Sequence, residues 1–268
     1  MMSHTPQDLQ DLRLTLVQPD LLWQEAARNR EILAERLLPL AGHTDLVVLP
    51  EMFTSAFVVG SGAIAETHPG PTLQWLQELS VTLNAAITGS VAVQVEGRKR
   101  NRLLFVTPEG AHYHYDKRHL FRMLGEHERY APGSAKLLLT WRGWRLFPMV
   151  CYDLRFPVWC RATAAEPYDL MLCVANWPAP RSEHWSTLLR ARAIENLAFV
   201  AGVNRVGRDG NGLDYAGQSA VYGPQGDTLA HAGDVETLVH ATLHPQDLQQ
   251  WRERFPAWRD ADDFQLLG

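Results

Sequence analysis

Short apolar runs rich in β-branched residues alternate along the chain with longer segments in which apolar residues recur at helical spacing. Leu12–Val17 and Leu46–Leu49 are the first two runs, and their length and composition are typical of strands. Between them, apolar residues recur at intervals of four, seven and four, as on one helix face: Leu22, Ala26, Leu33 and Leu37. The pattern predicts that the chain opens with a β-α-β unit.

The same alternation continues to the C-terminal part of the chain. A helix is predicted over Thr72–Leu83, and the runs Ala85–Val95 and Arg102–Thr107 flank Glu96-Gly97-Arg98 as a hairpin, which makes the sheet mixed. Further strands are predicted at Tyr113–Tyr115, Trp144–Val150, Leu170–Val174, Phe199–Val203, Ser219–Tyr222 and Leu238–Thr242, and helices at 158–166 and 182–198. No long linker or repeat interrupts the pattern, so one α/β domain is expected over residues 1–268.

Composition and charge narrow the class of protein. The chain has 268 residues, 46% of them hydrophobic and 21% charged, which is ordinary for a globular enzyme. A formal net charge of −5 disfavours a nucleic-acid partner, and no apolar run approaches the ~18 residues of a membrane span. The N-terminal stretch has no signal-peptide pattern, and the three cysteines have no CxxC spacing. A cytoplasmic protein without a membrane partner is expected.

Three predicted strands end in a reactive side chain. Leu46–Leu49 leads through Pro50 to Glu51, the strand at Tyr113–Tyr115 leads through Asp116 to Lys117, and Trp144–Val150 leads directly to Cys151. Strand ends are where α/β folds place their sites. A carboxylate, an ammonium and a thiol together are the parts of an acyl-transfer site, although each alone is more often structural.

Each of these residue types has a distinct task in amide hydrolysis. A thiol attacks a carbonyl as the thiolate, so Cys151 needs a base, and Glu51 in an apolar cleft is suited to accept its proton and to protonate departing ammonia. Lys117 and the backbone N–H of Tyr152 are candidates for stabilising the oxyanion. These roles predict a thioester intermediate.

The sequence segments around these three residues resemble motifs of the nitrilase, or carbon–nitrogen hydrolase, superfamily. The matching segments, in the family's order, are LPEMF (49–53), YDKRHLF (115–121), GEHERYAPG (125–133), CYDLRFP (151–157) and ARAIEN (191–196). The resemblance implies a four-layer αββα sandwich with mixed sheets, a Glu-Lys-Cys triad at Glu51, Lys117 and Cys151, no metal or organic cofactor, and a homodimer. It also implies a second glutamate, for which Glu126 is favoured and Glu128 remains an alternative.

Further segments are similar to the bacterial ω-amidase branch of that family. They are Asn176-Trp177-Pro178, His184-Trp185, the stretch 188–196 and the stretch 203–212. The resemblance implies release of ammonia from the ω-amide of small 2-oxo acids, 2-oxoglutaramate and 2-oxosuccinamate, and the alternative is a relative acting on another small amide or an N-carbamoyl compound. An arginine suits the substrate carboxylate, and the candidates are Arg155, Arg122 and Arg181. Phe57 and Trp177 are candidate pocket walls.

Three other classes compete with this interpretation. His112 and His114 share one face of a predicted strand, but no third ligand has a recognisable metal-binding spacing. The serine hydrolase motif G-x-S-x-G is absent from the sequence. A thiol sensor using Cys151, Cys160 and Cys173 is the remaining hypothesis, and it requires exposed thiols of low pKa.

Overall fold

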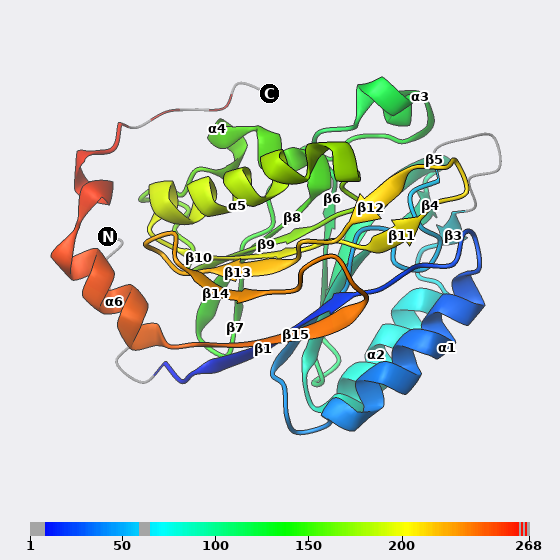
Figure 1. Cartoon of the computed structure of the whole chain (residues 1–268), viewed down its shortest axis with the longest axis horizontal. Helices are drawn as coiled ribbons and strands as arrows, with labels where there is room; N and C mark the ends of the chain where they lie inside the picture. The colour runs from blue at the N-terminus through cyan, green and yellow to red at the C-terminus, as the bar shows by residue number, and fades with distance from the viewer. Residues whose placement is uncertain (1–8, 59–64, 263, 265, 267–268) are drawn as a thin grey trace.

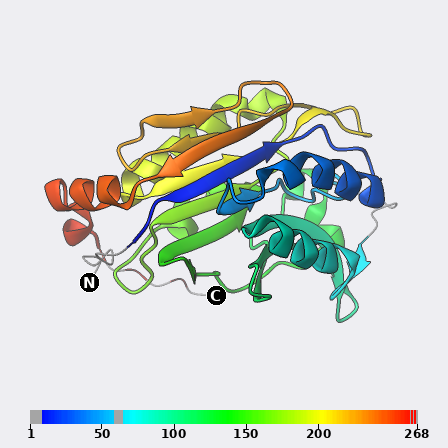
Figure 2. The same cartoon turned by 90° about the horizontal axis from the view of Figure 1, so that it is seen from below.

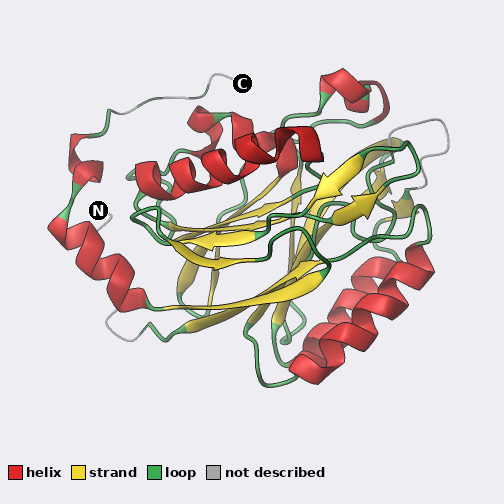
Figure 3. Cartoon of the chain, viewed as in Figure 1, coloured by secondary structure: helices red, strands yellow, loops and turns green. Residues whose placement is uncertain are grey.

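Two β-sheets pack face to face, with helices on their outer faces. The computed structural model describes residues 9–58, 65–262, 264 and 266. Figures 1 and 3 show the strands gathered in the interior and the long helices outside them. The view from below in Figure 2 shows α1 and α2 side by side against one sheet. This is the αββα arrangement that the family resemblance implied.

The first sheet carries the N-terminal part of the chain. Within the described residues it has seven strands, in the order β15-β1-β2-β4-β5-β6, with β3 paired to β4. β2 is parallel to its neighbours β1 and β4, whereas the other pairs along this order are antiparallel, so the sheet is mixed as predicted. The strands are β1 (Leu12–Gln18), β2 (Leu46–Val48), β3 (Glu66–Thr67), β4 (Ala86–Val95), β5 (Arg98–Val106), β6 (His112–Asp116) and β15 (Thr237–Leu243).

The second sheet carries the C-terminal half. Its six strands follow the order β14-β13-β10-β9-β8-β7 in the described part of the chain, and its central strands β8, β9 and β10 are parallel. The strands are β7 (Leu139–Trp141), β8 (Trp144–Val150), β9 (Leu170–Val174), β10 (Phe199–Val203), β13 (Ala220–Tyr222) and β14 (Thr228–His231), with a separate pair β11 (Val206–Arg208) and β12 (Asp214–Ala216).

Helices cover the outer faces of both sheets. α1 and α2 lie on the first sheet and α5 lies on the second, while α6 continues from β15 at one end of the sandwich (Figure 1). The α-helices are α1 (Ala26–Leu37), α2 (Pro71–Leu83), α3 (Glu126–Arg129), α4 (Pro157–Cys160), α5 (Ser182–Asn196) and α6 (Pro245–Arg254). Short 3₁₀ turns are η1 (Leu38–Leu40), η2 (Arg122–Leu124), η3 (Cys151–Arg155), η4 (Ala179–Arg181) and η5 (Ala257–Asp260).

Strand alternation explains how two cores form around one sheet. In β5, Leu103 and Phe105 pack in the core shared with the second sheet, whereas Leu104 and Val106 pack in the core beneath α1 and α2. Successive side chains of a strand point to opposite faces, so a strand that is apolar at every position fits a sheet covered on both sides. Each fully buried side chain of this size contributes roughly 1.5–3 kcal/mol to stability.

Two predicted helical features are wrong. The helix expected over 158–166 ends at Cys160, where Arg161 has extended backbone and the Ala162 N–H is bonded to the side-chain oxygen of Asn196 at 2.9 Å. Leu22 lies before α1 and is 41% exposed. The side chain of Asn29 binds both backbone polar groups of Leu22, at 2.9 and 2.8 Å, and so fixes it outside the helix.

Candidate functional site

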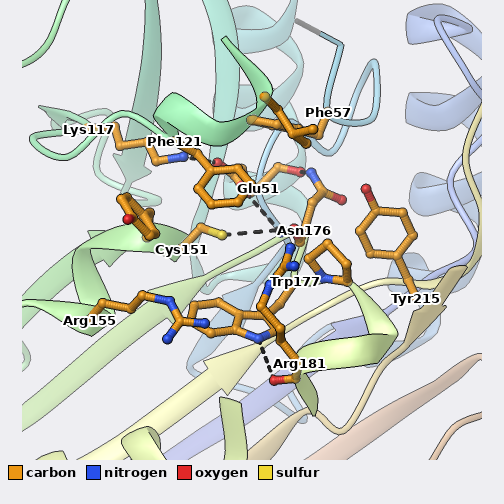
Figure 4. A pocket seen from close by; sticks show the side chains of 13 residues that line it. Glu51, Phe57, Lys117, Phe121, Cys151, Arg155, Asn176, Trp177, Arg181 and Tyr215 are labelled. Atoms are coloured by element: carbon orange, nitrogen blue, oxygen red, sulfur yellow. Dashed lines mark hydrogen bonds and ion pairs between the residues drawn. The ribbon is translucent and has the colours of Figure 1, made fainter. Parts of the chain in front are cut away.

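Glu51, Lys117 and Cys151 line one pocket, although they follow strands of two different sheets. Glu51 comes after β2 and Lys117 after β6 in the first sheet, whereas Cys151 comes after β8 in the second. The empty volume of the pocket is about 390 Å³, and Figure 4 shows the three side chains converging on it. The facing sheets therefore bring together three strand ends that are far apart in the sequence.

A buried lysine lies between two buried carboxylates. The Lys117 Nζ is 2.8 Å from Glu51 Oε1 and lies 3.1 and 2.9 Å from the two carboxylate oxygens of Glu126. Both glutamates are fully buried, and the backbone N–H of Phe121 also donates to Glu126 Oε2 at 2.6 Å. Glu128, the alternative in the sequence, is exposed. The structure therefore places Glu126 beside the lysine.

Two asparagines that sequence reasoning missed fix the position of Glu51. Asn101, within β5, donates from its amide nitrogen to Glu51 at 2.7 Å and to Glu126 at 3.3 Å. The backbone N–H of Asn176, just after β9, donates to the other oxygen of Glu51 at 2.8 Å, and its side chain donates to the Glu51 carbonyl at 2.7 Å. Both carboxylate oxygens of Glu51 are thus held. Asn101 lies among the polar residues that open β5, so no local sequence pattern marked it.

The charges of the cluster shift the pKa values of its members. Burial would lower the pKa of Lys117, but the carboxylates of Glu126 and Glu51 outweigh it and hold that pKa well above its usual range. Burial raises the pKa of Glu126, and so does the nearby Glu51 carboxylate. The Lys117 ammonium only partly offsets them. Burial, and then the nearby Glu51 carboxylate, raise the pKa of the Cys151 thiol well above its ordinary value. The thiol is therefore neutral until a base takes its proton.

The backbone at Cys151 is strained. Its φ of +46° lies in the left-handed region, which a residue with a side chain adopts at a cost of about 1–3 kcal/mol. Cys151 is the first residue of η3, and its Sγ lies 3.9 Å from the carbonyl oxygen of Asn176. Such conformations persist where the surrounding structure fixes them, as at sites that must present a side chain.

Phe57 and Trp177 line the pocket, as the sequence predicted. The ring of Phe57 has its centroid 5.2 Å from the Lys117 Nζ. The indole of Trp177 lies 4.7 Å beneath the Arg155 guanidinium, and its N–H donates to the Arg181 carbonyl at 2.7 Å. Tyr152, named for its backbone N–H, also borders the pocket. Sequence reasoning missed four further wall residues: Phe121, Leu124, Pro178 and Tyr215.

Two arginines face this pocket without a carboxylate partner. Arg155 and Arg181 both line it, and neither forms an ion pair within the described residues. The Arg155 guanidinium lies 3.1 Å from the His184 Nδ1. Burial, together with the charge of Arg181, lowers the pKa of Arg155. Arg122 is exposed and is not among the residues that line the pocket. These two guanidiniums are therefore the candidates in this pocket for pairing with an anion.

The competing sites have a different geometry. His112 and His114 are exposed on β6, and the described residues contain no group of three or more His, Cys, Asp or Glu placed to hold a metal ion. Cys160 and Cys173 are buried, and burial raises the pKa of Cys160 to about 12 and that of Cys173 well above its usual range. Buried thiols of high pKa are poor redox sensors. Over the described part of the chain, no helix is long and apolar enough to cross a bilayer.

The sequence and the fold are similar to those of known amidases and carbon–nitrogen hydrolases. The omega-amidase YafV of Escherichia coli K12 is 49% identical over 256 residues, which cover 95% of this chain and 98% of that protein. The 2-oxoglutaramate amidase of Bacillus subtilis is 33% identical, covering 81% of this chain and 85% of its own. The crystal structure of XC1258 from Xanthomonas campestris, a CN-hydrolase superfamily protein with an arsenic adduct in the active site, is 50% identical with a TM-score of 0.94, covering 97% of this chain and 100% of its own. The carbon-nitrogen hydrolase family model matches residues 13–253, and the chain belongs to that family.

Proposed function

We propose that the protein is an ω-amidase that hydrolyses the ω-amide of small 2-oxo acids, such as 2-oxoglutaramate and 2-oxosuccinamate, and releases ammonia. The observation that carries the proposal is that one pocket of about 390 Å³ holds both a thiol–carboxylate–ammonium cluster and two guanidiniums without carboxylate partners. Such a substrate has an amide at one end and a carboxylate at the other. The guanidinium fork pairs with carboxylate through two parallel hydrogen bonds, so the two ends of the pocket match the two ends of the substrate. The names of the relatives in E. coli and B. subtilis support the same substrate class.

In the proposed acylation step, Glu51 takes the proton of the Cys151 thiol as the sulfur attacks the amide carbon. The carbonyl oxygen becomes an oxyanion, which the Lys117 ammonium and the Tyr152 N–H stabilise. The C–N bond then breaks, Glu51 returns the proton to the departing nitrogen, and ammonia leaves. The product of this half-reaction is a thioester between Cys151 and the acyl group.

The deacylation step uses the same groups in the reverse order. Glu51, again a carboxylate, removes a proton from a water molecule that attacks the thioester carbon. Lys117 and the Tyr152 N–H stabilise the second oxyanion, and its collapse breaks the C–S bond. Cys151 recovers the proton from Glu51, and the product leaves as a carboxylic acid that loses its remaining proton to solvent, giving the 2-oxo dicarboxylate. Glu126, bonded to Lys117, keeps the ammonium in place in both steps.

Asn176 supplies a second contact for the substrate amide. Its side chain is almost fully buried, yet its Oδ1 atom has no hydrogen-bond partner in the structure. Figure 4 shows this amide beside Glu51, with its oxygen directed toward the side of Tyr215. A buried acceptor without a partner costs about 1–3 kcal/mol, which a donor from the substrate NH₂ would recover. This contact would select an amide over an ester at the reacting end.

The test is ammonia release from a panel of compounds. The panel contains 2-oxoglutaramate, 2-oxosuccinamate, glutamine, asparagine, an N-carbamoyl amino acid and a simple nitrile, assayed with the natural protein and with Cys151→Ala. Turnover confined to the 2-oxo amides and lost in the variant is the expected result. Turnover only on the N-carbamoyl compound, or retained in Cys151→Ala, would overturn the proposal.

We further propose that the enzyme is a single-domain homodimer that works in the cytoplasm, without a nucleic-acid or membrane partner. The homodimer is proposed from the family resemblance, since the exposed apolar side chains of Met123, Val158 and Ile194 are single positions that do not by themselves mark an interface. Light scattering on the purified protein tests this assembly, and a mass of one chain across the working concentration range would contradict it.

A further inference from the structure

We infer that Asp153 is a positioning residue, whose buried carboxylate fixes the turn at Cys151 against the segment that carries Lys117. Asp153 is the third residue of η3 and is fully buried. It is not among the residues that line the pocket, and its side-chain hydrogen bonds in the described part of the chain go to Tyr115, His119 and Val150, not to Glu51, Lys117 or Cys151. The inference concerns how the reacting groups of the proposed function are held at their working distances.

The Asp153 carboxylate accepts four hydrogen bonds from three separate places in the chain. Its Oδ2 accepts from the Tyr115 hydroxyl at 2.7 Å and from the Val150 N–H at 3.1 Å. Its Oδ1 accepts from the His119 N–H at 2.9 Å and lies 2.8 Å from the His119 Nδ1. A carboxylate has about four lone-pair sites, so these contacts use its full capacity.

These donors flank two of the reacting residues. Val150 directly precedes Cys151, while Tyr115 and His119 lie two residues before and two residues after Lys117. Val150 belongs to β8 of the second sheet, whereas Tyr115 belongs to β6 of the first sheet and His119 lies three residues after that strand. One rigid carboxylate therefore ties the thiol's strand end to the ammonium's strand end across the two sheets.

The histidine partner is itself held in place. The His119 ring stacks on Phe156, with centroids 3.8 Å apart and planes 13° apart, and meets the edge of Trp159 at 5.7 Å. The Tyr115 hydroxyl, besides donating to Asp153, accepts the Arg118 N–H at 3.1 Å. Donors that are fixed by their own contacts hold the Asp153 carboxylate in a more precise position than flexible donors would. Supporting residues of this kind keep a site in its productive geometry.

The hydrogen bond from the Val150 N–H to Asp153 helps to hold the strained backbone of Cys151. A non-glycine residue at φ +46° relaxes toward ordinary backbone unless its neighbours prevent it. The bond from the Val150 N–H to Asp153 spans the Cys151 peptide and closes the turn. Without it, the Sγ would move relative to Glu51, and a displacement of about 1 Å at a reacting group can cost about 100-fold in rate.

The variant that tests this is Asp153→Asn, with Asp169→Asn as the matched control. The asparagine keeps the size of the side chain and one acceptor oxygen for His119, but turns an NH₂ donor toward the Val150 N–H. Asp169 is also a fully buried aspartate, and it binds Arg145 and Arg252 away from the pocket. We expect kcat to fall about 100-fold in Asp153→Asn with KM nearly unchanged, whereas Asp169→Asn lowers the melting temperature but keeps kcat below that temperature.

A second readout does not depend on the substrate. Because burial and Glu51 raise the pKa of the Cys151 thiol, a thiol that moves away from them ionises more readily. Modification of Cys151 by iodoacetamide, followed by mass spectrometry at neutral pH, should therefore become faster in Asp153→Asn while amide turnover falls. The control variant should be modified at the natural rate. Because unfolding would also expose the thiol and abolish turnover, circular dichroism and a melting curve must first show that Asp153→Asn is folded at the assay temperature.

If Asp153→Asn does not fold, Tyr115→Phe removes a single donor to the same carboxylate and should give a smaller loss of kcat in the same direction. The inference is overturned if Asp153→Asn keeps kcat within about twofold, or if both aspartate variants lose kcat equally. The kcat measurement rests on the proposed function, because it requires turnover of an amide substrate. Should the natural protein turn over none of the amides, an unchanged iodoacetamide rate in Asp153→Asn would overturn it independently, and a faster rate would support it while the proposed substrate failed.

Discussion

Replacing Lys117 by methionine should separate the two tasks that this residue performs. Methionine has a similar length but no charge, so the change leaves Glu51 and Glu126, both fully buried, without their ammonium. Breaking a buried ion pair by removing one partner costs about 3–5 kcal/mol of unfolding free energy. Loss of one oxyanion donor costs kcat a further factor of about 10²–10³. The variant should therefore be both less stable and nearly inactive.

The stability loss should depend on pH in a defined direction. Without Lys117, burial and mutual repulsion raise the pKa of at least one of the two carboxyls above its unfolded value, as burial already does for Glu126. A group whose pKa is raised on folding stabilises the protein below its unfolded pKa, and this stabilisation is lost as pH rises through the folded pKa. The difference in unfolding free energy between natural protein and variant should therefore be smaller at about pH 5.5 than at about pH 8.

The assay pairs urea denaturation at the two pH values with ammonia release at the higher one. Lys136→Met is the control, because Lys136 pairs with the half-exposed Glu166 at 2.7 Å outside the pocket, and removing such a pair costs about 1 kcal/mol or less. Near-natural kcat in Lys117→Met would show that the residue is structural and that the oxyanion assignment is wrong. A stability difference that grows toward acid pH would refute the charge argument.

Two further predictions concern the ends of the pocket. Arg155→Met should lower kcat/KM for a 2-oxo amide by roughly 10- to 100-fold, the value of a charge-assisted hydrogen bond, whereas exposed Arg122→Met should leave it unchanged; steady-state kinetics measure both. Glu51→Gln should abolish amide turnover yet increase the thiolate fraction of Cys151 at a given pH, because the Glu51 carboxylate raises the pKa of that thiol. The ultraviolet absorbance of the thiolate measures this fraction. A lower thiolate fraction than in the natural protein would contradict the prediction.

The sequence predicted most of the fold because hydrophobic periodicity is strong where an element is buried. The strand β8 and the helices α2 and α5 lie within two residues of their expected ends. α6 was not predicted because it is short and has few apolar residues: Pro245, Leu248 and the half-buried Trp251 stand among seven polar ones. Its position comes from Arg252, which binds the buried Asp169, and no local pattern reveals such a pair.

The site could be predicted at strand ends and not elsewhere. Glu51, Lys117 and Cys151 were found because an apolar run stops at or just before each of them. Asn101 and Asp153 have no such mark: Asn101 lies inside β5 and binds Glu51 of the same sheet, whereas Asp153 lies inside a turn of the second sheet and binds Tyr115 of the first. Which sheet faces which is a tertiary fact, so polar residues that bridge the sheets cannot be identified before the sheets are placed.

Formal charge in the pocket argues for the 2-oxo acid over the corresponding amino acid. Two carboxylates and one ammonium give the buried cluster a charge of −1, and moving the thiol proton to Glu51 leaves that charge unchanged, so the nucleophile forms without burying a new charge. With Arg155 and Arg181 at the other end, a substrate carboxylate brings the occupied pocket to neutrality.

Glutamine would add an ammonium next to these two guanidiniums, and a like-charge contact at about 4 Å costs about 4 kcal/mol at an effective dielectric constant near 20. Even after partial screening, kcat/KM for 2-oxoglutaramate should exceed that for glutamine by at least about 100-fold, and Arg181→Met should narrow the ratio. Salt should also narrow the ratio, because Arg155 and Arg181 are only half-buried and their charges stay open to partial screening. Equal values of kcat/KM for the two amides, or a ratio that Arg181→Met leaves unchanged, would show that the guanidiniums do not select the substrate.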